Sequence, residues 1–158
     1  MNKKLIVVSW VLVVLQALLI FYFSSKPAAQ SREMSKGVTE IVINTMAAIT
    51  PGREANLDIG RVHFLVRKNA HFISYMILGL LSMNAVRKTG FVRFKGILIT
   101  FLICLVYAIS DEFHQTFIPG RSGEVRDVVI DSIGGIAGIV FYFVITQRKS
   151  WSLPSSKS

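Results

Sequence analysis

Four long apolar stretches, separated by charged segments, constrain this chain more than any other feature of its sequence. They cover about residues 5–23, 69–86, 96–110 and 128–147. A helix of about 20 apolar residues spans the hydrocarbon core of a bilayer and satisfies its backbone polar groups internally. The predicted fold class is therefore all-α, a polytopic membrane helix bundle with four transmembrane helices.

Composition and charge agree with a small membrane protein. The 158 residues suit a single domain, residues 1–158, and 52% of them are hydrophobic, with a mean hydropathy of +0.53. An ordinary soluble domain is less apolar. The net charge of +9 does not indicate nucleic-acid binding, because the basic residues flank the apolar stretches instead of covering one polar face. We expect no nucleic-acid partner.

Lysine and arginine predict the orientation of the bundle. The segments 1–4, 87–95 and 147–158 carry nine basic residues and no acid, whereas all nine acidic residues lie in 24–68 or 111–131. Loops rich in basic residues stay preferentially in the cytoplasm. We therefore expect a multi-pass protein of the cell membrane with both termini cytoplasmic. The first stretch is longer than the apolar region of a signal peptide, so it is interpreted as an uncleaved helix.

The segment between the first two apolar stretches contains an amphipathic pattern. Apolar residues recur at helical spacing from Met34 to Ile49, and the charged residues fall mainly on the other face. Pro51 and Gly52 end this pattern. We predict an amphipathic helix on the outer surface, where it either contacts lipid or caps the bundle.

Ionisable residues concentrate in the segment 111–131, which holds five carboxylates, one histidine and two arginines. The uncharged parts of the third and fourth stretches would be about 22 and 24 Å long as helices, shorter than a hydrocarbon core of about 30 Å. We expect Asp111 and Asp131 to lie below the outer headgroups, with His71 at the same level. Charged groups at such depth usually mark a functional site. Close helix approach is expected at Gly134, Gly135 and Gly138.

Two histidines and two acids are candidates for proton transfer: His71, Asp111, Glu112 and His114. Asp111 and His114 stand three residues apart, so a continuing helix points both to one side. Such a pair either presents metal ligands or orients the histidine as a general base. For His71, the alternative to proton transfer or metal ligation is a histidine bonded within the bundle.

A second set of polar residues is predicted to bind a ligand. Arg121 follows a Pro-Gly turn that would set its guanidinium over the pocket, where it suits a phosphate or carboxylate. The alternative is an ion pair with Asp127 or Glu124. The predicted ligand-binding residues are Lys68, Tyr75, Gln115, Arg121, Asp127 and Asp131. A divalent cation is the cofactor that this region could hold, on Asp111, His114 and Asp131. Mg²⁺ or Mn²⁺ suits these ligands better than structural zinc does, and the mixed His and Asp ligands leave zinc as an alternative.

These motifs resemble the VanZ-like membrane protein family, the teicoplanin-resistance protein family. The matching pieces are RKNAHFISYMILG and ISDEFHQTFIPGRSGEVRDVVIDSIGGIAG, within about residues 65–143. The family is named for a glycopeptide-resistance accessory protein associated with teicoplanin resistance in Gram-positive bacteria. Many relatives have Asn where this chain has Asp131, so the resemblance implies no required charge there. It implies these family-motif residues: Lys68, His71, Tyr75, Asp111, Glu112, His114, Gln115, Phe117, Gly120, Arg121, Asp127 and Gly135.

The predicted function is that of a cell-envelope membrane protein with a polar pocket on its extracytoplasmic side. This pocket binds or modifies the headgroup of a membrane lipid or of a lipid-linked cell-wall precursor. The resemblance alone implies an effect on glycopeptide susceptibility. The alternative is a structural or partner-binding membrane protein whose buried ion-pair network only organises the bundle. Neither enzymatic activity nor an oligomeric state is predicted.

Overall fold

The computed structural model describes residues 3–49, 58–91 and 93–151, and in these ranges the chain forms helices and short turns without any strand. Five helices follow one another: α1 (Lys3–Ser24), α2 (Ala28–Ile49), α3 (Ile59–Lys88), α4 (Arg93–Gln115) and α5 (Val125–Trp151). The all-α prediction is confirmed for this part of the chain. Pro51 and Gly52, which were predicted to end the amphipathic helix, lie outside the described residues.

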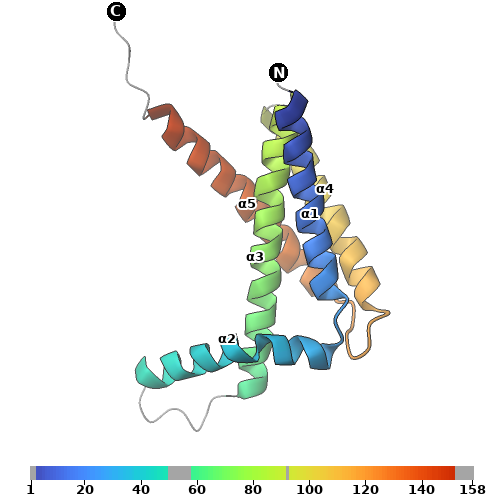
Figure 1. Ribbon diagram of the computed structural model, residues 1–158, viewed down its shortest axis with the longest axis vertical. Helices are drawn as coiled ribbons and strands as arrows, with labels where there is room; N and C mark the ends of the chain where they lie inside the picture. The colour runs from blue at the N-terminus through green and yellow to red at the C-terminus, as the bar shows by residue number, and fades with distance from the viewer. Residues whose placement is uncertain (1–2, 50–57, 92, 152–158) are drawn as a thin grey trace, which may run out of the picture.

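Figure 1 shows α1, α3 and α4 running side by side, while α5 crosses α3 at a tilt and α2 lies across the lower part of α3. The start of α1 and the end of α5 lie toward one end of the molecule. The α4–α5 loop and α2 lie toward the other end (Figure 1). The amphipathic segment is thus a helix as predicted, and this helix lies across the bundle instead of along it.

Three helical segments are long and apolar enough to cross a membrane: Lys3–Ser24, Phe94–Gln115 and Val125–Thr146. They correspond to the predicted first, third and fourth spans. The predicted second span, residues 69–86, lies within α3 and is not confirmed as membrane-spanning by length and composition. The physical reason is that Asn69, His71 and Asn84 interrupt its apolar sequence.

Glycines bring α3 and α5 into close contact. A Cβ atom added at Gly134 would lie 2.5 Å from the carbonyl oxygen of Phe72, and one added at Gly138 would overlap the carbonyl oxygen of Met76. Helix backbones approach to this distance only where side chains are absent. The expected close approach at these glycines is confirmed, and it determines how α5 lies against α3 at the level of the polar residues.

Candidate functional site

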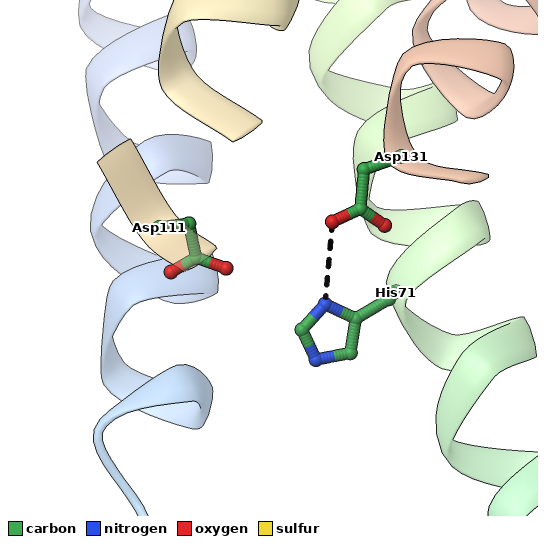
Figure 2. Close-up of side chains that lie close together, drawn as sticks. All are labelled: His71, Asp111 and Asp131. Atoms are coloured by element: carbon green, nitrogen blue, oxygen red, sulfur yellow. Dashed lines mark ion pairs between the residues drawn. The ribbon is translucent and has the colours of Figure 1, made fainter. Parts of the chain in front are cut away.

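Three side chains from three different helices point toward one another near the α4–α5 loop (Figure 2). His71 lies on α3, Asp111 on α4 and Asp131 on α5. The two aspartates are buried, with exposed fractions of 3% and 1%. One ligand atom from each of the three residues lies within 4.8 Å of the other two, and His71 Nδ1 is 3.8 Å from Asp131 Oδ2. The structure therefore brings together the residues that the sequence placed at one level.

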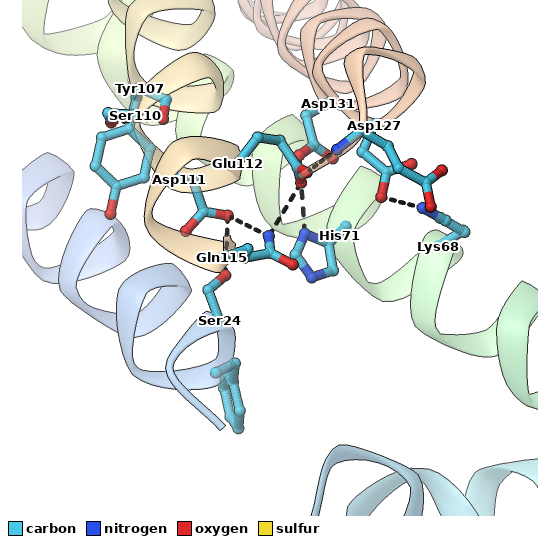
Figure 3. A network of polar contacts seen from close by, with 12 residues as sticks. Ser24, Lys68, His71, Tyr107, Ser110, Asp111, Glu112, Gln115, Asp127 and Asp131 are labelled. Atoms are coloured by element: carbon cyan, nitrogen blue, oxygen red, sulfur yellow. Dashed lines mark hydrogen bonds and ion pairs between the residues drawn. The ribbon is translucent and has the colours of Figure 1, made fainter. Parts of the chain in front are cut away.

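Hydrogen bonds hold Asp111 in a defined orientation. Its Oδ2 atom accepts a bond of 2.9 Å from the Ser24 hydroxyl and one of 3.2 Å from Gln115 Nε2 (Figure 3). Its Oδ1 atom is buried and accepts no hydrogen bond from the described residues. Asp111 thus has one oxygen bound by the protein and one that faces the shared space with His71 and Asp131.

Gln115 connects the two acids of α4 to the following loop. Its Nε2 also donates to Glu112 Oε1 at 3.0 Å, and its Oε1 accepts from Arg121 Nη1 at 3.0 Å. The second carboxylate oxygen of Glu112 accepts from the Glu124 backbone N–H at 3.0 Å. Gln115 and Glu112 therefore fix the loop to the end of α4, and both side chains are buried.

Arg121 links this loop to the end of α1. Its Nε donates to the carbonyl of Lys26 at 2.9 Å and its Nη2 to the carbonyl of Phe23 at 3.2 Å. Within the described ranges it forms no ion pair with Asp127 or Glu124, so the alternative expected from the sequence is wrong. Its role as a ligand-binding residue stays a prediction, because the guanidinium already donates to three protein oxygens.

Lys68 and Asp127, both predicted to bind a ligand, form an ion pair with each other. Lys68 lies on α3 and Asp127 in the first turn of α5, so the pair joins these helices beside the site. The Lys68 ammonium also lies 5.0 Å from the ring centroid of Phe64. This lysine is therefore not a cation partner for the buried aspartates.

His114 and Tyr75 occupy different surroundings from those expected for them. The His114 ring packs on Phe21 with centroids 4.5 Å apart, and its buried Nδ1 has no hydrogen-bond partner among the described residues. The predicted metal set contained His114, but the structure gathers His71 with the two aspartates instead. The Tyr75 hydroxyl, one helical turn from His71, is also buried without a hydrogen-bond partner in the described chain.

A mostly apolar cavity of about 920 Å³ adjoins His71. Its polar lining includes Arg61, Arg67, His71 and Arg121, together with Asp58. Burial lowers the pKa of Arg121, and the positive charge of nearby Arg67 lowers it further. The apolar wall comes from α1, α2 and α3, and includes Ile20, Phe23, Met34, Val38, Val42, Met46, Val62, Leu65, Val66 and Ile73.

A smaller cavity of about 60 Å³ lies beside the loop. Its lining includes Arg67, Lys68, His71, Gln115, Gly120, Arg121, Ser122, Glu124 and Asp127. Eight of the ten predicted site residues thus take part in the polar contacts or line a cavity at this end of the bundle, where the helix ends meet. The remaining two are Tyr75 and His114.

Two residues of the site, Ser24 and Arg67, are not among the predicted site residues. Arg67 precedes His71 by four positions, so its helical spacing was a usable signal for a shared face. Ser24 contacts Asp111 across 87 positions in the sequence, and no local pattern announces such a contact. It depends on how α1 packs against α4.

Comparison with known proteins supports the resemblance noted in the sequence. The sequence profile of the VanZ/LLP1 family matches residues 9–146. The match includes most of the first and fourth apolar stretches, all of the second and third, the α4–α5 loop and the three residues of Figure 2. Comparisons with curated proteins and with solved structures gave no match. Because the matched region is most of its length, the chain belongs to the VanZ/LLP1 family.

Proposed function

We propose that this protein is a single-domain, multi-pass protein of the cell membrane in which α3 is the fourth membrane-spanning helix. The start of α1 and the end of α5 face the cytoplasm, and the α4–α5 loop and α2 face outward. The positive charge of the segments 1–4, 87–95 and 147–158 supports this orientation. The close contact of α3 with α5 supports a common depth for both helices.

Labelling of single cysteines tests this topology. In a Cys104→Ala background, we expect Ile59→Cys and Ser122→Cys to react with a membrane-impermeant maleimide in intact bacterial cells. Phe91→Cys should react only after the membrane is permeabilised, because this residue lies between α3 and α4 on the proposed cytoplasmic side. All three positions are exposed in the structure. Equal labelling of Ile59→Cys and Phe91→Cys in intact cells would show that α3 does not cross.

We further propose that the outward end of the bundle binds an anionic amphiphile, a membrane lipid or a lipid-linked cell-wall precursor. The observation that carries this proposal is the cavity of about 920 Å³, whose lining is mostly apolar and includes the three arginines Arg61, Arg67 and Arg121. Apolar walls with few polar groups are typical of ligand sites. An acyl or prenyl chain fits the wall between α2 and α3, and a phosphate headgroup fits Arg67.

Arg67 is the residue best placed to bind such a headgroup. It lines both cavities, and its guanidinium forms no hydrogen bond or ion pair with any residue in the described ranges. Lys68 and Arg121, by contrast, are bound to protein groups. A guanidinium that is free of protein partners is available for bidentate contact with phosphate.

Native mass spectrometry of the protein released gently from its membrane tests this binding. We expect an anionic lipid to remain bound to the wild type, and Arg67→Gln to weaken the binding roughly tenfold, since a charge-assisted hydrogen bond is lost. Arg126→Gln is the matched control, because Arg126 is exposed and lines neither cavity. Equal retention in both variants, or bare wild-type protein, would contradict the proposal.

A structural or partner-binding role is the second candidate, and one observation favours it. The contacts of Gln115, Arg121 and the Lys68–Asp127 pair already join four elements within the protein. Under that role the polar network organises the bundle and the function lies in a partner. An effect on glycopeptide susceptibility in Gram-positive bacteria is proposed only from the family, through altered exposure of a bound precursor.

A further inference from the structure

We propose that His71, Asp111 and Asp131 form a binding site for a divalent metal ion. The residues come from α3, α4 and α5, so an ion bound between them would join the three helices (Figure 2). The proposal goes beyond lipid binding, because it concerns a different ligand held by different atoms. It follows from charge, from the free oxygen atoms and from the surrounding hydrogen bonds.

Three carboxylates at this end of the bundle are buried without an ion pair to any lysine or arginine in the described part of the chain. Asp111, Glu112 and Asp131 are all buried, with exposed fractions of 3%, 5% and 1%. Of the basic side chains nearby, Lys68 pairs with Asp127, Arg121 donates to neutral oxygens, and Arg67 forms no ion pair with these acids in the described ranges. Buried carboxylates are stable when they are paired or bound to a metal ion, and are otherwise protonated.

Free ligand atoms face the space between the three residues. Asp111 Oδ1 and Asp131 Oδ2 are buried and accept no hydrogen bond from the described residues. The nearest ion-pairing atom to Asp131 Oδ2 is His71 Nδ1, at 3.8 Å, beyond hydrogen-bond distance. The three atoms lie within 4.8 Å of one another, whereas neighbouring ligand atoms bound to one ion at about 2.1 Å are about 3–3.5 Å apart, so the atoms must approach by up to roughly 1.5 Å. Small side-chain rotations supply this movement.

The surrounding residues orient one carboxylate as a metal site requires. Ser24 and Gln115 both donate to Asp111 Oδ2, which leaves Oδ1 directed at the shared space. Metal-binding carboxylates are commonly held by such outer hydrogen bonds, and removing one weakens metal binding by roughly 10- to 100-fold. An imidazole with two carboxylates suits Mn²⁺ and Zn²⁺, and three protein ligands leave further positions for water or a ligand oxygen.

Metal binding to the full-length protein in detergent tests the proposal directly. After removal of metal with EDTA, Mn²⁺ alone is added, and the concentration of free Mn²⁺ is measured by electron paramagnetic resonance. In a parallel sample Zn²⁺ is added, and the Zn²⁺ bound to the protein is measured by elemental analysis. We expect one ion per wild-type chain and a rise in melting temperature on loading. His71→Gln and Asp131→Asn should each weaken binding at least tenfold, and Ser24→Ala roughly tenfold.

His114→Gln is the matched control, because this histidine lies on α4 near Asp111 but packs on Phe21. It should retain wild-type affinity. Loss of binding in His114→Gln with retention in His71→Gln would overturn the proposed ligand set. Absence of both binding and thermal shift in the wild type would overturn the site itself and indicate a protonated acid instead. The measurement on the wild type tests the metal site even if a variant fails to fold. Lipid binding is measured in a separate experiment, so its outcome does not affect this test.

Discussion

Gly138→Ala is expected to destabilise the protein by about 3 kcal/mol, at the upper end of the usual range for overpacking. A methyl group at this position would overlap the carbonyl oxygen of Met76 and lie 2.7 Å from the backbone nitrogen of Leu80. Both are backbone atoms of α3, so no side-chain rotation relieves the overlap. The helices α3 and α5 must separate, and the site that they share with α4 must open.

Gly37→Ala is the matched control for this substitution. Gly37 lies within α2, and nothing comes within 4 Å of a Cβ added there. Alanine has a higher helix propensity than glycine, so this variant should be more stable by up to about 1 kcal/mol. The melting temperatures of both variants are measured in detergent, with unfolding monitored by size-exclusion chromatography. Equal melting temperatures for the two would show that the α3–α5 contact is looser than described.

Arg121→Gln should also destabilise the protein, by about 3 kcal/mol. The guanidinium donates to the carbonyls of Phe23 and Lys26 and to the side chain of Gln115. Hydrogen bonds from a charged donor contribute about 1.5–3 kcal/mol each, and they are not additive. Glutamine is too short to reach all three acceptors, so the loop should detach from the end of α1. We expect a lower melting temperature and faster trypsin cleavage at Lys26.

Arg126→Gln serves as the control for charge alone, because it removes one arginine from an exposed position near the start of α5. Its free energy of unfolding should stay within about 0.5 kcal/mol of the wild-type value. Unchanged stability of Arg121→Gln would instead support the ligand-binding role that the sequence suggested for Arg121. If Arg121→Gln kept full stability but lost a bound anionic lipid, the guanidinium would be a ligand-binding group and not a link between α1 and the loop.

The helices could be predicted from the sequence because their signals are local. Apolar runs and the amphipathic repeat gave all five helical regions, and three of the spans satisfy the length and composition of a membrane helix. The helix boundaries were less predictable. The helix α3 begins at Ile59, ten residues before the apolar stretch, because helical hydrogen bonding continues through charged residues such as Arg61 and Arg67.

Only the depth of the candidate site in the bundle could be predicted from the sequence. Sequence spacing put His71, Asp111 and Asp131 at one depth, and the structure brings these residues together. The sequence predicted His114 as the histidine that shares a metal ion with the aspartates, whereas the structure places His71 beside them. That choice depends on the rotation of each helix about its axis, and the packing of His114 on Phe21 turns its ring toward α1.

The sequence by itself determined that this is an all-α protein with helices long and apolar enough to span a membrane, and that its acids gather toward one end. These properties follow from backbone hydrogen bonding within each helix and from the cost of placing charge in hydrocarbon. Only the tertiary structure decided which polar atoms meet. The glycine contacts of α3 with α5 and the bonds from Arg121 to α1 set the positions of the helices. Contacts such as Ser24 with Asp111 follow from those positions, because they join residues that are distant in the sequence.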